Sequence, residues 1–165
     1  MQTDKLYLVG FMGAGKSTIA RALGRRLGWR VEDIDERIEA RERRSVATIF
    51  AQQGEAYFRQ LERQALSELL PQRHIIVATG GGTFAEADNR GLMLSDGAVA
   101  WLDVPLAQVM KRVPNDGRRP LAADRQAMEQ LYQRRQLAYA QAHVRIDSSG
   151  AVPEVVEHLL EWIGY

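Results

Sequence analysis

Residues 6–23 read LYLVGFMGAGKSTIARAL, in which a short apolar segment runs into a loop with three glycines and then into a helical pattern. The loop matches G-x-x-x-x-G-K-[ST], beginning at Gly10 and ending at Lys16 and Ser17. It stands between an apolar strand and a helix, which is the setting that a phosphate-binding loop requires. The alternative is a glycine-rich turn that merely starts a helix. The stretch predicts a bound phosphate and leaves hydrolysis, sensing and transfer open.

The residue types of the loop indicate how it would bind a nucleotide. Glycines let backbone N–H groups point inward around phosphate oxygens at a helix N-terminus. Lys16 is expected to reach the β- and γ-phosphates, and Ser17 to offer its hydroxyl to Mg²⁺. The expected contacts with the nucleotide phosphates in this loop are Gly13, Ala14, Gly15, Lys16, Ser17 and Thr18.

Apolar segments and helical patterns alternate along the rest of the chain. Strands are expected at residues 5–9, 30–32, 75–79, 99–103 and 144–147. Helices are expected from Lys16 to a terminating Gly28 and at residues 36–43, 46–53, 56–70, 86–94, 106–112, 126–142 and 153–162. This alternation is typical of a layered α/β fold with a mainly parallel sheet. Ligands then bind beyond the carboxyl ends of the strands, where GFMGAGKS, EDID and TGGG follow the first three.

The bulk composition limits the class of protein. A chain of 165 residues fits one domain, and its formal net charge of +1 gives no strong field for a nucleic acid or an anionic membrane. The absence of cysteine excludes disulfides, thiolate metal sites and a cysteine nucleophile. No signal sequence or membrane span is recognisable, so the expected location is the cytoplasm. His74, His143 and His158 stand far apart and are expected to be structural or surface residues.

Two carboxylates follow the second expected strand, Asp33 and Asp35 in EDID. Residues two apart on an extended chain share a face. One of the two could then hold metal-bound water while the other accepts a proton from an attacking hydroxyl. The alternative is a helix start, because aspartate is common at an N-cap or in a first turn. Beside a phosphate loop we favour the chemical interpretation.

Several arginines become informative only as a set. Arg59 stands beside two aromatic residues in GEAYFRQLER, with Arg63 one helical turn further on, and LYQRRQLAYAQAH supplies Arg134 and Arg135. A single helical arginine is ordinarily a solvated surface residue. The most loop-like long segment, VPNDGRRPLAAD at residues 113–124, holds two more. Whether these arginines are functional or merely solvated depends on a sequence pattern that includes them together with TGGG.

That pattern resembles the shikimate kinase family. GFMGAGKST, DID, the FR of GEAYFRQLE, GGG, RRPL and RRQLAY occur in order and with similar spacing along nearly the whole chain. The resemblance implies an enzyme that uses ATP and Mg²⁺ to phosphorylate the 3-hydroxyl of shikimate, on the way to chorismate and the aromatic amino acids. It also implies one domain with a three-layer P-loop fold, in which helices flank a five-stranded parallel sheet. A helical acceptor-binding region would lie near residues 33–63, and a mobile lid near residues 112–124.

The resemblance further implies roles at the acceptor site. Asp35 would contact the shikimate hydroxyls and act as the base or orienter of the nucleophile, while Asp33 would hold Mg²⁺ through its water shell. Arg59 and Arg135 would clamp the shikimate carboxylate. The backbone of the glycine turn would help them, at Gly80, Gly81 and Gly82.

Other implied roles concern the nucleotide and the walls of the site. Arg119 looks like the catalytic lid arginine that closes on the ATP phosphates, and Arg118 competes for this role because the lid reads RRPLAAD. Arg112 is similar to the arginine that stacks on adenine and so would bind ATP. Phe50 and Phe58 would wall the shikimate site, although ordinary core packing explains them equally well.

Two other interpretations stay open at this point. A related small kinase for another anionic polyol, such as gluconate, would share the loop and the fold but lack the F-R and GGG set. A non-catalytic nucleotide switch, or a protein that merely binds shikimate-like acids, would need no base after the second strand. The expected partners are ATP and shikimate, and family habit predicts a monomer.

Overall fold

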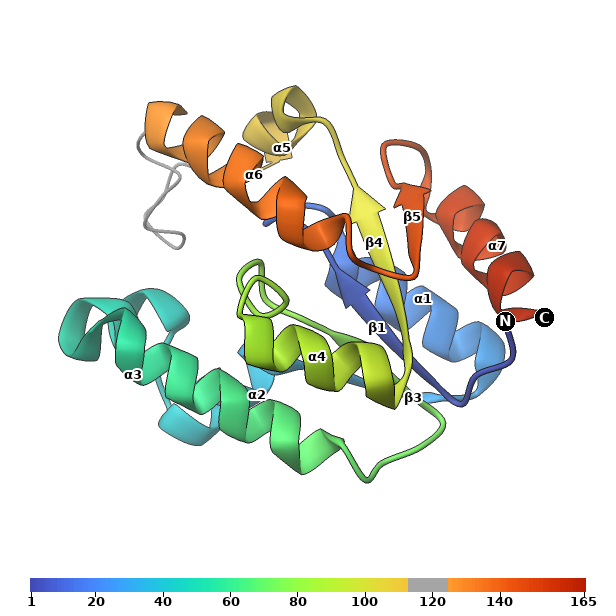
Figure 1. Ribbon diagram of the computed structural model, residues 1–165, viewed down its shortest axis with the longest axis horizontal. Coiled ribbons are helices and arrows are strands. Elements are labelled where there is room, and N and C mark those ends of the chain that lie inside the picture. Colours follow the sequence, from blue (N-terminus) through green and yellow to red (C-terminus); the bar gives the residue numbers. More distant parts are fainter. Residues whose placement is uncertain (113–124) are drawn as a thin grey trace.

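The described part of the chain forms five strands: β1 (Lys5–Val9), β2 (Arg30–Asp33), β3 (Ile75–Ala78), β4 (Ala98–Asp103) and β5 (Val144–Asp147). In the computed structural model, which describes residues 1–112 and 125–165, they pair in parallel in the order β2-β3-β1-β4-β5 (Figure 1). All five expected strands are therefore present, with bounds that differ by at most one residue. The predicted α/β fold with a five-stranded parallel sheet is confirmed.

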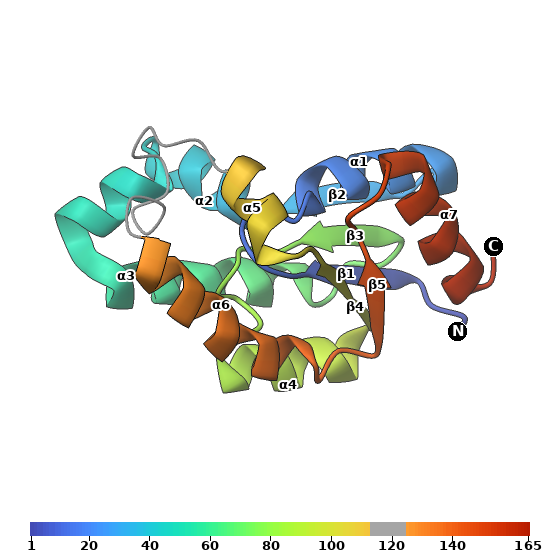
Figure 2. The ribbon, with the colours of Figure 1, turned by 90° about the horizontal axis from the view of Figure 1, so that it is seen from above.

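Seven helices are present among the described residues. They are α1 (Lys16–Leu27), α2 (Ile34–Glu42), α3 (Val46–Leu69), α4 (Ala87–Asp96), α5 (Leu106–Arg112), α6 (Arg125–Tyr139) and α7 (Val152–Ile163). Helices α1 and α7 cover one face of the sheet and α4 covers the other, which gives the predicted three layers (Figure 2). Within the same described ranges, no helix is both long enough and apolar enough to cross a membrane.

Four helices differ from the expectation by two residues or more: α4 ends at Asp96 instead of residue 94, α6 ends at Tyr139 instead of residue 142, and α2 and α3 differ as follows. The helix expected at residues 36–43 begins two residues earlier, because the side chain of Asp33 accepts a hydrogen bond from the Glu36 N–H and caps α2 at its N-terminus. The two helices expected at 46–53 and 56–70 run together as α3, which is interrupted by non-helical backbone at Gly54. The sequence thus predicted the break in α3 correctly but placed the start of α2 too late.

The buried centre of the sheet follows from its residue types. Strands β1 and β3 are buried along their whole length, and β4 is buried up to its last residue. These strands are covered on both faces, so they are rich in Leu, Ile, Val and Ala rather than alternating with polar residues. The edge strands β2 and β5 instead expose Arg30 and Arg145, which discourages pairing with another chain.

The topology brings two loops together at one edge of the sheet. Strand β1 leads into α1 on one face, whereas its neighbour β3 leads into α4 on the opposite face (Figure 2). Where two neighbouring strands are followed by helices on opposite faces of the sheet, a crevice for ligands forms between the carboxyl ends of the strands. The phosphate loop after β1 and the glycine turn after β3 border this crevice.

A charged cluster anchors α3 and α4 at the opposite end of the sheet. Lys5 is fully buried, and its Nζ donates to the backbone carbonyls of Leu69 at 2.6 Å and Leu70 at 3.1 Å. The same Nζ lies 2.6 Å from Asp96 Oδ2, which also accepts a hydrogen bond from the Tyr7 hydroxyl at 2.6 Å. The last carbonyls of α3 are thereby held by a cation that the Asp96 carboxylate neutralises.

Candidate functional site

The phosphate loop packs directly against the end of β4. A Cβ atom at Gly10 would stand 2.6 Å from the carbonyl oxygen of Leu102, so only glycine fits there. Lys16 opens α1 and is buried, and its Nζ donates to the carbonyl oxygens of Gly10 at 2.6 Å and Phe11 at 2.9 Å. The loop carbonyls thus hold the ammonium group inside the loop, beside the space that a phosphate would occupy.

Ser17 and Asp33 form a pair of oxygen donors next to the loop. The Ser17 hydroxyl donates to Asp33 Oδ2, and Asp33 Oδ1 accepts from the Glu36 N–H at 3.0 Å. The carboxylate is therefore fixed through both oxygens: it caps α2, as the helix-start interpretation expected, and it lies beside the phosphate loop, where its role toward Mg²⁺ stays a prediction. A hydroxyl and a carboxylate are donors that Mg²⁺ accepts, so these residues fit that ion.

Within the described residues, no group of three or more His, Asp or Glu side chains is arranged to hold a metal ion. Mg²⁺ commonly binds through one or two protein oxygens, several waters and the phosphates of a nucleotide. The pair of Ser17 and Asp33 is compatible with this mode of binding, in which the nucleotide supplies part of the coordination.

Asp35 reaches the site by a different route from the one expected. The expectation rested on an extended chain through Asp33 and Asp35, but the chain turns helical at Ile34 and Asp35 lies in the first turn of α2. The spacing argument was therefore wrong. The position nevertheless brings the carboxylate to the glycine turn, since a Cβ at Gly80 would stand 2.8 Å from Asp35 Oδ1.

The other two glycines of the turn lie against the two arginines of the expected clamp. A Cβ at Gly81 would stand 3.0 Å from Arg135 Nη1, and a Cβ at Gly82 would stand 2.5 Å from Arg59 Nη2. Real Cβ atoms almost never approach a neighbour as closely as 2.5 Å. Each of the three glycines thus makes room for a different expected site residue, and one short turn gathers side chains from α2, α3 and α6.

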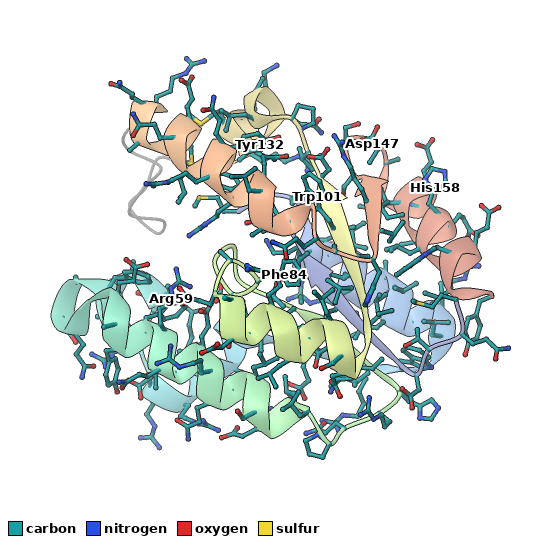
Figure 3. The ribbon with its side chains drawn as sticks, viewed as in Figure 1. Arg59, Phe84, Trp101, Tyr132, Asp147 and His158 are labelled. Carbon is teal, nitrogen blue, oxygen red and sulfur yellow. The ribbon has the colours of Figure 1, made fainter. Side chains whose placement is uncertain are left out.

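Arg59 is held in place by a buried carboxylate. Figure 3 shows Arg59 on the part of α3 that faces the turn before α4. Its Nη1 donates to Glu62 Oε1 at 2.7 Å, and Glu62 Oε2 accepts from the Thr83 hydroxyl at 2.7 Å. The hydroxyl oxygen of Thr83 in turn accepts from the Gly80 N–H at 3.1 Å. This chain of hydrogen bonds fixes the guanidinium relative to the glycine turn.

Burial and neighbouring charges act on Arg59 in opposite directions. Burial lowers the pKa of its guanidinium, but Glu62 and Glu55 together raise that pKa by more, so the net shift is upward. The Nε–H of Arg59 is buried and donates no hydrogen bond to any described residue, although Glu86 Oε1 lies 4.0 Å from the nitrogen. Since a buried donor without an acceptor is costly, this N–H marks a position where an anionic ligand would be favourable.

Arg135 lies at the other side of the glycine turn. Burial lowers the pKa of its guanidinium, and the nearby positive charge of Arg59 lowers it further. The guanidinium lies over the ring of Phe11 from the phosphate loop, 6.0 Å from its centre. One helical turn on, the buried Tyr139 donates a hydrogen bond to the carbonyl of Gly81. Helix α6 thereby holds both the arginine and the turn.

Three residues of this arrangement were missed from the sequence: Glu62, Thr83 and Tyr139. A signal for Glu62 was present, because a carboxylate three residues after an arginine on a helix faces it. Neither Thr83 nor Tyr139 carried a comparable local signal, since their partners are backbone groups or residues far away in sequence. The surface interpretation was correct for Arg63 and Arg134, which are both exposed.

The remaining expected residues lie around this centre. Arg112 is exposed at the end of α5, and its Nη1 donates to the carbonyl of Gly13 at 3.3 Å. Phe50 and Phe58 contact each other with ring centres 4.9 Å apart, and Phe58 is buried. Arg118 and Arg119, with the rest of the expected lid from residue 113 to 124, lie outside the described residues.

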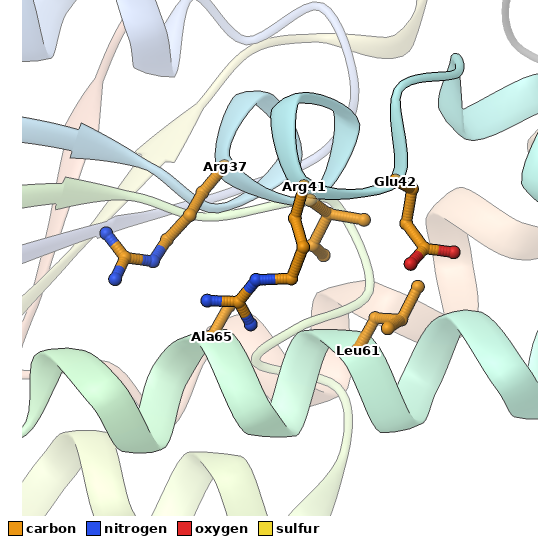
Figure 4. Close-up of a pocket in the computed structure, with 6 residues that line it drawn as sticks. Arg37, Arg41, Glu42, Leu61 and Ala65 are labelled. Atoms are coloured by element: carbon orange, nitrogen blue, oxygen red, sulfur yellow. The ribbon is translucent and has the colours of Figure 1, made fainter.

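A narrow crevice between α2 and α3 is a separate feature. Its lining residues include Arg37, Arg41, Glu42, Leu61 and Ala65, and it leaves no room for a water molecule (Figure 4). Since none of the expected site residues lines it, this crevice is a packing seam between two helices rather than a ligand site.

A parallel five-stranded sheet with a glycine-rich loop between β1 and α1 defines a P-loop protein of the α/β class. A family model described as shikimate kinase matches residues 12–164. A shikimate kinase from Persephonella marina is 41% identical over 94% of this chain and 96% of the relative. The chain belongs to the shikimate kinase family.

Solved structures agree with this assignment. The structure of shikimate kinase from Acinetobacter baumannii in complex with shikimate is similar with a TM-score of 0.92 and 34% identity, over 97% of this chain and 92% of that chain. The structure of shikimate kinase from Aquifex aeolicus is similar with a TM-score of 0.87 and 33% identity, over 95% and 94%. The resemblance inferred from the sequence motifs is thus confirmed.

Proposed function

We propose that this chain transfers the γ-phosphate of ATP to the 3-hydroxyl of shikimate, giving shikimate 3-phosphate and ADP. Membership of the shikimate kinase family supports the activity. The observation that carries it is the glycine turn at residues 80–82, which lies against Asp35, Arg135 and Arg59 in turn, next to a phosphate loop. A non-catalytic binder would need the two arginines but not the carboxylate, and a simple nucleotide switch would need neither.

The acceptor is held by its carboxylate. Arg59 offers a buried Nε–H that donates no hydrogen bond in the described part of the structure, and Arg135 is a partly buried cation whose pKa is lowered by burial and by Arg59. A substrate carboxylate would relieve both costs, with each charged hydrogen bond contributing about 1.5–3 kcal/mol. Phe50 and Phe58 would contact the ring of the acceptor at its apolar side.

Asp35 then acts on the hydroxyl that reacts. As the 3-hydroxyl oxygen attacks the γ-phosphorus, its proton passes to the Asp35 carboxylate and the bond from the phosphorus to the β-phosphate oxygen breaks, releasing ADP. The carboxylate lies close to Gly80, in the same glycine turn whose next two residues lie against Arg135 and Arg59. This location supports the role of base or orienter for Asp35.

The donor end of the reaction rests on the phosphate loop. The N–H groups of Gly13, Ala14, Gly15 and Thr18 would bind phosphate oxygens, and Lys16 would exchange its loop carbonyls for the β- and γ-phosphates. Ser17 directly, and Asp33 through water, would hold Mg²⁺, which supplies neutralising charge across the phosphates when it is bound.

The proposal extends to the lid that covers the nucleotide, to the oligomeric state and to the cellular location. Arg119, with Arg118 as the competing candidate, would neutralise the transferring phosphate from a lid near residues 112–124, and Arg112 would lie on the adenine. The acceptor region would span residues 33–63 of a single domain. We further propose a cytoplasmic monomer whose small-molecule partners are ATP and shikimate.

An ADP-release assay tests this function with a panel of acceptors. Shikimate, quinate, gluconate and nucleoside monophosphates are each supplied with ATP and Mg²⁺. We expect ADP formation to rise with shikimate and to stay near the level without acceptor for gluconate and the nucleotides. A rise with gluconate alone would favour the related polyol kinase, and no rise with any acceptor would favour a binding protein.

A further inference from the structure

The middle of α3 contains a backbone conformation that is nearly exclusive to glycine. Gly54 has φ 82° and ψ 175° inside a helix of 24 residues. This region is accessible to glycine and is strongly unfavourable for other residues. A Cβ at Gly54 would meet no atom of the described residues within 4 Å, so among them the restriction arises from the backbone and not from lack of space. Glycine is therefore required at residue 54 for the kink in α3.

A single arginine joins the two parts of α3 across this kink. The Arg44 guanidinium donates to Gln52 Oε1 at 2.7 Å and to Gln53, both of which precede the kink. It also donates to Glu42 Oε1 at 2.7 Å, which accepts in turn from the hydroxyl of Tyr57 beyond the kink at 2.8 Å. The guanidinium lies 5.8 Å from the centre of the Tyr57 ring. The Arg44 side chain is 22% exposed: its contact with Glu42 is partly shielded from water, whereas its contacts with Gln52 and Gln53 are exposed.

Helix α2 holds both parts of α3 as well. Before the kink, the Val46 N–H donates to Glu39 Oε2 at 2.9 Å. After the kink, Glu68 accepts from Arg37 at 3.0 Å and from Arg41 at 2.6 Å, along the crevice of Figure 4. The bend angle is thus set from outside by α2 and by Arg44, which follows its C-terminus.

The residues that the kink orients belong to the acceptor site. Phe50 precedes it and Phe58 follows it, and their rings meet across the bend at 4.9 Å. Glu55, the first residue after the kink, lies 3.3 Å from Arg59 Nη2. If residue 54 adopted helical angles instead, α3 would be a straight helix and the Phe50 ring would lose its contact with the Phe58 ring.

We propose that Gly54 and Arg44 are positioning residues for the acceptor: the kink that they form and hold places Phe50 against Phe58 and orients Arg59 for the substrate carboxylate. This inference rests on the proposed function, because it takes shikimate as the acceptor. Neither residue touches the reacting groups, so both act through the phenylalanine pair and Arg59.

The test separates acceptor binding from general stability. We expect Gly54→Ala to raise the KM for shikimate about tenfold and Arg44→Ala to raise it about threefold or more, while the KM for ATP changes less than about twofold. The matched control for the glycine is Gly91→Ala, since Gly91 lies in α4 with ordinary φ and open space around it. The control for the arginine is Arg26→Ala, which removes an exposed ion pair with Glu157.

Two results would overturn the inference. One is a shikimate KM within about twofold of the wild type in both variants; the other is an equal rise in both KM values, which would indicate a general structural role. Arg44→Ala decides the matter if Gly54→Ala does not fold. Failure of the proposed function is seen separately, as a wild type that does not use shikimate. In that case amide hydrogen exchange of residues 46–53 tests the kink: faster exchange in both variants supports it, and unchanged exchange overturns it.

Discussion

The guanidinium of Arg59 lies across Gly82, so close that a Cβ atom at this position would stand 2.5 Å from Nη2 and 2.6 Å from Nη1. The lack of a side chain at Gly82 is therefore what allows the Arg59 guanidinium to lie where it does. The same guanidinium is also fixed by Glu62, whose Oε1 accepts from Nη1 at 2.7 Å. An acceptor carboxylate would thus meet an arginine that is already oriented, which lowers the cost of ordering it on binding.

The first prediction concerns Gly82→Ala. Because the obstructing group is the end of a flexible side chain, the protein should fold, but Arg59 must leave its place. We expect the KM for shikimate to rise about tenfold or more while the KM for ATP stays nearly constant. Steady-state kinetics in both substrates measure this. Gly91→Ala is the control, and an unchanged shikimate KM in Gly82→Ala would show that the contact has no part in binding.

The second prediction concerns the arginine clamp itself. Arg59→Ala or Arg135→Ala removes one or two charged hydrogen bonds of about 1.5–3 kcal/mol each, which corresponds to a rise in shikimate KM of about tenfold to a hundredfold or more. Arg134→Ala, on the exposed side of α6, should leave the KM unchanged. If the KM moved in neither clamp variant, the carboxylate would have to bind elsewhere.

The third prediction concerns the carboxylate near Gly80. Asp35→Asn keeps the size of the side chain but removes the acceptor for the proton, so kcat should fall by about 10²–10⁴-fold. ATP binding, followed by calorimetry, should persist. Asp88→Asn is the matched control, because Asp88 is also an acid in the first turn of a helix but is exposed on α4. Wild-type turnover in Asp35→Asn would remove this residue from the reaction.

The fourth prediction concerns stability at the far end of the sheet. Burial raises the pKa of Asp96, but hydrogen bonds from Lys5 and Tyr7 lower it by more, so its pKa in the folded protein is below the ordinary value. A carboxyl with a depressed folded pKa contributes stability above its unfolded pKa, and this contribution is lost as the pH falls through the folded pKa.

Asp96→Asn should accordingly lower the free energy of unfolding by about 3 kcal/mol at pH 7, because it leaves the buried Lys5 without its anion. The difference from the wild type should shrink below about pH 4. Urea unfolding at several pH values measures both effects, with Asp88→Asn as the exposed control. A difference that is constant from pH 7 to pH 3 would mean that the ionised form of Asp96 is not what stabilises the fold.

Most of the fold could be predicted from the sequence because its signals are local. Buried parallel strands are short apolar runs, and the phosphate loop joins one of them to a helix whose end at Gly28 is also marked by residue type. The start of α2 could not be placed correctly, since Asp33 serves both as the cap of that helix and as the acceptor for Ser17. The hypothesis of a functional role for Asp33 was therefore preferred to the capping signal that the structure shows.

The candidate site was predicted only in part. The family motifs pointed to the glycine turn and the arginines, but not to which glycine faces which side chain. That assignment depends on how α2, α3 and α6 converge, and residues up to 58 positions apart take part in it, as for Tyr139 and Gly81. The buried Glu62 could have been inferred from its spacing after Arg59, whereas Thr83 and Tyr139 required the three-dimensional structure.

The most direct measurement is the identity of the product formed from ATP and shikimate, determined by phosphorus and proton NMR of the reaction mixture. We predict a single phosphorylated acceptor with the phosphate on the 3-hydroxyl, formed in step with ADP and absent from the Asp35→Asn reaction. Release of ADP and inorganic phosphate without any phosphorylated shikimate, or a phosphate on another hydroxyl, would contradict the proposed arrangement of donor, acceptor and base.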